Sequence, residues 1–439
     1  MMTMSTADTN GYIETELGLV PVDWAVVTLA EATLKTGTRD PRRNPTITFR
    51  YIDVSSVSNE IYRITNHNQI VGGDAPSRAR KVVFGGDTIF ATVRPYLRNI
   101  AQVSDDLHDS ICSTGFCVIR ANKQISDSGY LYYAVLTDDF VGRVVARQKG
   151  SSYPAVTDKE IYAQLIPLPP LPEQLRIAAV LNAIQEAIAA QDDVIAAARA
   201  VKRSLLQRLF TYGPGQEPAE TKETEIGELP AHWEVVQFGD SIATGPQNGL
   251  YKSLTLYGSG TPILRINDYE NDGSFFTLAF RRVQVAQEEF ERYRLYAKDI
   301  VINRVNSLSH LGKAALIPEL PEPSIFESNM MRLRLDSKKL LPDYAILWLL
   351  HPNAREQMRG KAKRAVAQSS INQGDMKSLL IPRPNMVQQQ QIAEMMAAIE
   401  NKIAVEEDRK AALQAFFKSL LHQLMTGQLR LLSDKGLPL

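Results

Sequence analysis

The chain has 439 residues, enough for two or three domains with cores of their own. Its 49 basic and 49 acidic side chains cancel, so the total charge gives no indication of a nucleic-acid-binding protein. No apolar run approaches the about 18 residues that a membrane helix needs, and the chain shows no leader pattern, so we expect a cytoplasmic protein without a membrane partner.

A short segment near the start returns in the second half of the chain. Residues 15–31 read TELGLVPVDWAVVTLAE and residues 224–240 read TEIGELPAHWEVVQFGD, with Gly, Pro, Trp and Val-Val at matching places. A repeat this long indicates a duplicated domain. We interpret Trp24 and Trp233 as core anchors, with stacking on a base as the alternative.

Between these segments the sequence predicts a mainly β region that ends in a helix. Alternating apolar residues predict strands near 46–54, 81–84, 88–93 and 115–120, followed by a helix from about 129 to 148 and a loop at 149–154. The second half repeats the order, with a helix at 344–358 and a loop at 364–370. The fold class is therefore α+β, with two duplicated globular domains.

Each domain is followed by a long stretch with a seven-residue apolar repeat. Residues 172–210 contain no glycine or proline after Pro172, and the same register returns 215 residues later. Such a repeat predicts a coiled coil in which the two helices are partners, although two helices of a bundle are the alternative. The seam residues are Ile177, Leu181, Ile184, Ile188, Ile195, Leu205, Leu209, Ile392, Met396, Ile399, Ile403, Leu413, Phe417, Leu420 and Leu424.

These signals divide the chain into six parts. We expect a first domain with the N-terminal segment at 1–160, a long helix at 161–213, a linker at 214–224, a second domain at 225–380, a second long helix at 381–427 and a tail at 428–439.

Motifs for catalysis are missing from the sequence. No GxxxxGK[ST] phosphate loop or dinucleotide loop occurs, and Cys112 and Cys117 do not fit a zinc spacing. The six histidines are scattered, and we interpret each as a surface residue. We therefore expect no catalytic residue, no metal and no cofactor.

The predicted loops instead contain residues that reach phosphates and base edges. Arg and Asn can bind guanine and adenine bidentately, whereas Lys and Ser mostly contact phosphate. For any one residue a solvated surface is the ordinary alternative, but as a set on two duplicated domains they favour DNA. The candidates are Arg39, Arg42, Arg43, Asn44, Arg78, Arg80, Arg94, Tyr96, Arg98, Asn99, Lys149, Ser151, Ser152, Asn248, Tyr251, Lys252, Arg304, Asn306, Ser307, His310, Lys363 and Arg364.

Several motifs together resemble one family. IGELPAHWEVV, GDTIFATVRPYLRN, DIVINRVNSLSHLGK, ESNMMRLR, PQNGLYK and IPLPPLPEQLRIA, in their positions along the chain, are similar to the DNA-specificity subunit of type I restriction-modification systems. The start of the second long helix, residues 386–391 (MVQQQQ), departs from the Pro/Glu pattern of the first.

This resemblance implies two target-recognition domains, each followed by a long helix, with the helices packed as an antiparallel coiled coil. Each domain would read one half of a bipartite, asymmetric sequence in double-stranded DNA, with an unread gap between the halves. The coiled coil would dock two methyltransferase subunits, and restriction subunits with translocase and nuclease activity would join them. The methyl donor and ATP would belong to those partners.

Two other functions are open at this point. The neutral total charge is compatible with a coiled-coil adaptor that holds two protein-binding domains apart, and salt-insensitive interactions would support it. A chain that is itself a methyltransferase or nuclease would need motifs that the sequence lacks.

Overall fold

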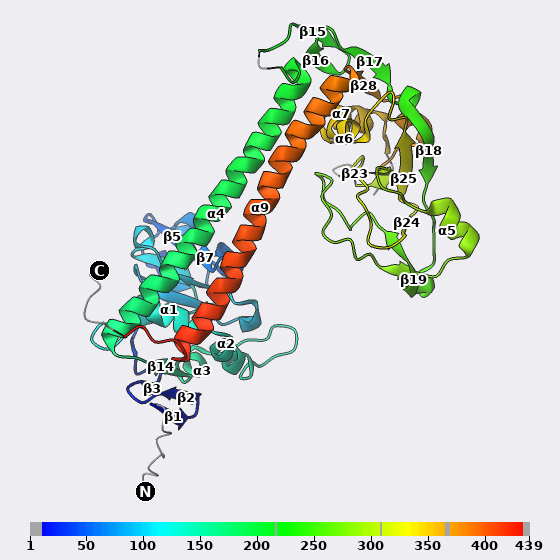
Figure 1. The fold of residues 1–439 in the computed structure, drawn as a ribbon. Helices are drawn as coiled ribbons and strands as arrows, with labels where there is room; N and C mark the ends of the chain where they lie inside the picture. The colour runs from blue at the N-terminus through cyan, green and yellow to red at the C-terminus, as the bar shows by residue number, and fades with distance from the viewer. Residues whose placement is uncertain (1–10, 216, 308–309, 365–368, 433–439) are drawn as a thin grey trace. The chain divides into compact units, whose positions relative to one another are not determined.

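The computed structural model describes residues 11–215, 217–307, 310–364 and 369–432 (Figure 1). The chain forms two compact units, residues 1–193 with 408–439 and residues 194–407. Each unit contains one copy of the duplicated frame, together with the start of one long helix and the end of the other.

The first unit is built from small sheets and short helices. Its two four-stranded sheets have the orders β11-β10-β13-β4 and β8-β5-β12-β9, and β1-β2, β14-β3 and β6-β7 form two-stranded pairs. The strands are β1 (Tyr12–Thr15), β2 (Gly18–Pro21), β3 (Ala25–Thr28), β4 (Thr33–Leu34), β5 (Thr48–Ile52), β6 (Val57–Ser58), β7 (Arg63–Ile64), β8 (Asn68–Val71), β9 (Ala79–Val83), β10 (Thr88–Ala91), β11 (Ile100–Gln102), β12 (Ser110–Ser113), β13 (Phe116–Ala121) and β14 (Leu165–Leu168). The short helices are α1 (Ser128–Leu136), α2 (Asp138–Val145) and α3 (Asp158–Tyr162).

The second unit repeats the main sheet of the first. Its orders are β18-β25-β21-β23, β20-β19-β24 and β22-β27-β26, with the pairs β15-β16 and β17-β28. The strands are β15 (Thr221–Thr224), β16 (Gly227–Pro230), β17 (Glu234–Gln237), β18 (Ile242–Asn248), β19 (Tyr257–Leu264), β20 (Arg282–Val283), β21 (Ile300–Asn303), β22 (Val305–Asn306), β23 (Ala314–Leu316), β24 (Ile325–Phe326), β25 (Met330–Leu335), β26 (Lys363–Arg364), β27 (Ser369–Ser370) and β28 (Leu380–Arg383). The short helices are α5 (Gln287–Tyr293), α6 (Pro342–Leu350), α7 (Pro352–Lys361) and α8 (Gln373–Lys377).

The two long helices, α4 (Leu171–Tyr212) and α9 (Met386–Met425), pack in antiparallel order within each unit (Figure 1). In the first unit Leu181 of α4 shares a core with Leu424 of α9, and in the second unit Leu209 of α4 shares a core with Ile392 of α9. The start of one helix therefore meets the end of the other. This arrangement confirms the expected α+β fold with paired long helices.

The seam residues lie along these contacts. Polar interruptions of the repeat make ion pairs, with Lys410 Nζ 2.6 Å from Asp192 Oδ1 and Lys202 Nζ 2.9 Å from Glu400 Oε1. Ten of the fifteen seam side chains are buried: Ile177, Leu181, Ile195, Leu209, Ile392, Met396, Ile403, Phe417, Leu420 and Leu424. The others are half-buried: Ile184, Ile188, Leu205, Ile399 and Leu413.

Buried glutamines fasten each long helix to its domain. Gln174 accepts a hydrogen bond from Asp127 N at 2.8 Å and donates to the carbonyls of Ile125 and Pro169 at 2.9 and 2.8 Å. Gln389 binds the second domain in the same way, through Leu341 N and the carbonyls of Lys339 and Pro384. Both glutamines bind main-chain atoms, so the identity of the neighbouring side chains matters little to the contact.

The repeated tryptophans lie in the cores, as expected, rather than on a base-stacking surface. Trp24 and Trp233 are buried, and each indole N–H donates to the third residue of a long helix. For Trp24 the acceptor is Glu173, which also pairs with Arg430. For Trp233 it is Gln388. The Gln-rich start of α9 therefore keeps the tryptophan contact without the negative charge.

The structure differs from the sequence prediction at the shorter elements. The helix expected at 129–148 is two helices, because Thr137 ends α1 and caps α2 by accepting from Phe140 N at 3.3 Å. The helix expected at 344–358 breaks likewise at His351, before Pro352. The expected linker at 214–224 ends in β15, which pairs with β16.

The expectation that every histidine lies at the surface is wrong for His351. Its side chain is 1% exposed and stacks on Trp348, with ring centroids 5.0 Å apart. None of the helices in the described part of the chain is long and apolar enough to cross a membrane.

Candidate nucleic-acid interface

The most constrained candidate loop of the first unit joins β10 to β11. Arg94 and Arg98 both adopt left-handed backbone conformations, at φ 49° and 55°, on either side of a single 3-10 turn at Pro95–Leu97. Such conformations are unfavourable for residues other than glycine and are often found at functional sites. The two arginines nevertheless have different surroundings.

Arg94 extends from the surface next to an aromatic ring. Its guanidinium carbon lies 5.4 Å from the centroid of the Tyr153 ring, and Tyr153 is 74% exposed. The backbone N–H of Arg94 donates to Pro154 O at 2.7 Å, which fixes the loop that carries Tyr153. Tyr96, on the same turn, is 48% exposed. Arg94 therefore has one exposed aromatic ring beside it, and a second exposed ring lies on its own turn.

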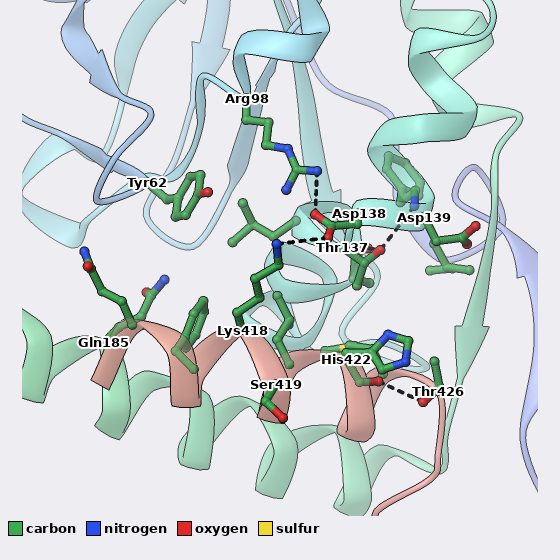
Figure 2. A pocket seen from close by; sticks show the side chains of 18 of the residues that line it. Tyr62, Arg98, Thr137, Asp138, Asp139, Gln185, Lys418, Ser419, His422 and Thr426 are labelled. Atoms are coloured by element: carbon green, nitrogen blue, oxygen red, sulfur yellow. Dashed lines mark hydrogen bonds and ion pairs between the residues drawn. The ribbon is translucent and has the colours of Figure 1, made fainter. Parts of the chain in front are cut away.

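Arg98 instead points into a hollow of about 1000 Å³ at the side of α2 and the long helices (Figure 2). Its guanidinium is 2.5 Å from Asp138, and Lys418 lies 3.6 Å from the same residue. Asn99 is also engaged, because its amide donates to Val54 O and Val57 O. Arg98 and Asn99 therefore have structural roles in this conformation.

The first candidate cluster, residues 39–44, is a turn with internal ion pairs. Arg39 binds Asp109 bidentately, and this hydrogen bonding lowers the pKa of the Asp109 carboxyl. Arg42 binds Asp40 and lowers the pKa of that carboxyl to about 2. Arg80 lies 3.4 Å from the same Asp40. These three cations are thus partly neutralised.

Other cations of the first unit face solvent. Arg43 and Arg78 are exposed and make no ion pair within the described part of the chain. Lys149 lies 3.4 Å from Glu160 but remains largely exposed. Asn44, Ser151 and Ser152 are exposed as well.

In the second unit the candidates are divided between ordered contacts and open surface. Lys252 pairs with Glu289 at 2.7 Å, and Arg304 donates to Ser328 O at 3.2 Å. Tyr251 is 79% exposed, and Asn248 and Lys363 are exposed too.

Of the remaining candidates of the second unit, three follow β21 and one lies in β26. Asn306 Oδ1 accepts from Ser307 N at 2.8 Å, and Ser307 Oγ lies 2.9 Å from His310 Nδ1. Arg364 belongs to β26, and its side chain lies outside the described part of the structure.

Two exposed arginines have aromatic partners that were not among the predicted residues. Tyr153 was not a candidate, although its neighbours Ser151 and Ser152 were. Arg281 of the second unit lies 5.9 Å from the Tyr257 ring centroid and was also missed. A tyrosine before proline in a glycine-containing loop was the available signal for Tyr153. Nothing local marked Tyr257, since Arg281 is distant in sequence.

Comparison with known proteins identifies the family. Residues 21–196 and 230–415 match the type I restriction modification DNA specificity domain. These two matches cover most of the chain and coincide with the two copies of the frame. The chain belongs to the type I restriction-modification specificity family.

Individual relatives of this specificity family agree. The chain is 34% identical over 205 residues to a putative type I restriction enzyme MjaX specificity subunit of Methanocaldococcus jannaschii, a match that spans 47% of this chain and 48% of the relative. It is 26% identical over 325 residues to the MjaVIII specificity subunit of the same organism, spanning 73% and 74%. The match to the EcoKI specificity subunit of Escherichia coli is 26% identical and spans 67% and 62%.

Solved structures of the specificity family share the fold. One chain, from work on complex assembly and conformational transition of the type I R-M system, superposes with a TM-score of 0.60 at 27% identity, covering 93% of this chain and 99% of that one. The S subunit from M. genitalium superposes with a TM-score of 0.53 at 13% identity.

Membership of this family confirms the prediction of a specificity subunit with two DNA-specificity domains. The family name describes a subunit that determines which DNA sequence is chosen. The partners of such a subunit are DNA and the other subunits of the restriction-modification complex.

Proposed function

We propose that this chain selects the DNA target of a type I restriction-modification complex and that each recognition domain reads one half of a bipartite, asymmetric sequence. The observation that carries the proposal is the duplicated frame with unlike loops. Gln174 and Gln389 make the same main-chain contacts, whereas the segment after β10 carries Arg94 in a loop and the segment after β21 carries Asn306 in the short strand β22. Unlike loops on equal frames favour unlike half-sites.

The partners follow from the family and from the helix pair. Two methyltransferase subunits would dock on α4 and α9, and restriction subunits with translocase and nuclease activity would join that complex. The methyl donor and ATP would be bound by those partners. The proposal places the chain in the cytoplasm, where cellular DNA is found.

A map of methylated adenines across a genome tests the function. Cells that express this chain with its methyltransferase should show a two-part asymmetric motif with a fixed gap, and cells that lack only this chain should not. An unchanged map from a methyltransferase shown to be active with another specificity subunit would contradict the proposal.

The neutral total charge is compatible with one alternative function, a coiled-coil adaptor that holds two protein-binding domains apart. Interactions of such an adaptor would be insensitive to nuclease, whereas DNA binding loses affinity steeply with salt through counterion release.

A further inference from the structure

The two recognition domains carry different residues at one equivalent position, three residues after a strand of the main sheet. In the first domain Val93 pairs with Ala155, and the next residue, Arg94, donates its N–H to Pro154 O. In the second domain Val305 pairs with Ser370, and the next residue, Asn306, pairs with Ser369. Arg94 and Asn306 thus follow equivalent strands of the two domains, and each pairs with the residue just before the partner of the preceding valine, Pro154 in the first domain and Ser369 in the second.

The described residues that pair with Val93 and Val305 have a second partner of the same kind. Lys149 pairs with Ala155 in the first domain, and Lys363 pairs with Ser370 in the second. Val93 and Val305, the residues before Arg94 and Asn306, therefore each pair with a residue that also pairs with a lysine, Ala155 in the first domain and Ser370 in the second. A lysine in this segment can contact a phosphate, which positions the protein, while another side chain of the domain contacts a base edge.

Arg94 is suited to present a guanidinium in a fixed direction. Its backbone is held in a left-handed conformation by the bond to Pro154, and its planar group lies over the Tyr153 ring. The described part of the chain offers it no carboxylate. Arg98, four residues later, has the same backbone conformation but binds Asp138. Of the two arginines on this turn, Arg94 is therefore free to contact DNA, whereas Arg98 is held by its ion pair with Asp138.

Asn306 is suited to present an oriented amide. Its Oδ1 accepts from Ser307 N at 2.8 Å, which limits rotation of the side chain, and its Nδ2 has no hydrogen-bond partner among the described residues. The oxygen retains a second lone pair, so the amide can still accept and donate on one edge.

We propose that position 94 of the first domain and position 306 of the second are equivalent base-reading positions, with Arg94 reading a guanine and Asn306 an adenine. An arginine matches guanine O6 and N7, and an asparagine matches adenine N7 and N6, each through two hydrogen bonds in the major groove. This inference rests on the proposed function, because it assigns a base class to each domain of a DNA-reading chain.

The test uses the full chain in complex with its methyltransferase and a duplex that carries the mapped target. Dissociation constants are measured for the target and for duplexes in which each base pair is replaced in turn. The variants are Arg94→Lys, which keeps the charge, Arg94→Gly, which suits the left-handed backbone, and Asn306→Ala. Arg98→Lys is the matched control from the same turn.

For the wild type, replacing the recognised G·C pair should weaken binding by roughly 5- to 150-fold, the range of one bidentate base contact. Arg94→Lys and Arg94→Gly should reduce that preference to within about twofold and leave preferences in the other half-site intact, as expected for loss of one base contact. Asn306→Ala should do the same for an A·T pair in the other half-site. Arg98→Lys should retain every preference.

Uniform weakening over all sequences would overturn the inference, because it indicates phosphate contact, and so would unchanged preferences in the Arg94 and Asn306 variants. A wild-type complex without any sequence preference would instead overturn the proposed function itself. Thermal unfolding of Arg94→Gly, expected at or above the wild-type midpoint, separates loss of reading from loss of folding.

Discussion

The surroundings of His351 favour the neutral form of its ring. Its ring stacks on Trp348, its Nε2 lies 3.0 Å from Gln207 Oε1, and its Nδ1 accepts from Asn353 N at 3.3 Å. Those two contacts fit a neutral ring with the proton on Nε2. Burial lowers the pKa of His351 to about 4, from the usual 6.5.

Stability of the second unit should consequently fall in acid. Below pH 6.5 the unfolded chain binds a proton at His351 that the folded chain takes up only near pH 4, so stability is lost between these values, by at most about 3 kcal/mol. Urea unfolding of the wild type and His351→Gln at pH 7.5 and pH 5 checks this. The variant should lose less stability on acidification, whereas the exposed control His422→Gln should match the wild type. Equal losses in all three proteins would contradict the expectation.

At the scale of elements, the hydrogen bonds of Gln389 predict a large loss of stability when this glutamine is replaced, and a small one when its neighbour is replaced. Gln389→Met should leave Leu341 N and the Pro384 carbonyl buried without partners, which costs about 2–4 kcal/mol for two such groups. Its neighbour Gln390 is exposed, and its one side-chain hydrogen bond among the described residues goes to Glu394 on its own helix, so Gln390→Met should change stability by less than about 0.5 kcal/mol. Urea unfolding of both variants gives the comparison, and equal values would show that Gln389 is no anchor.

The elements also show what the sequence could predict. The seven-residue repeat through Leu181 and Met396 predicted the paired helices, because long apolar rows must be buried against a partner. The break at Thr137 was missed, since threonine is an acceptable helix residue and its capping role depends on the local backbone. Ion pairs such as that of Arg98 with Asp138 were missed because both residues looked equally solvated. Exposed arginines could be named from sequence, but free ones could not be told from paired ones.

At the scale of the whole molecule, the zero net charge means that DNA binding must depend on a few unpaired cations. Arg43→Ala should lower the slope of log binding constant against log salt by about one, whereas Arg39→Ala should lower it less, because Arg39 already binds Asp109. Binding of the full complex to its target at several salt concentrations measures both slopes. A larger effect of Arg39 than of Arg43 would reverse this assignment of free and paired residues.

The glutamines that hold each domain to its long helix have a consequence for how such a chain can change over time. They grip carbonyls and amides, groups that every amino acid supplies, and the tryptophan contact persists when its acceptor changes from Glu173 to Gln388. Substitutions in the exposed loops therefore leave the fastening untouched. During evolution, one recognition domain can therefore be altered or exchanged, which changes the DNA sequence that it binds. The other domain then keeps its original DNA sequence.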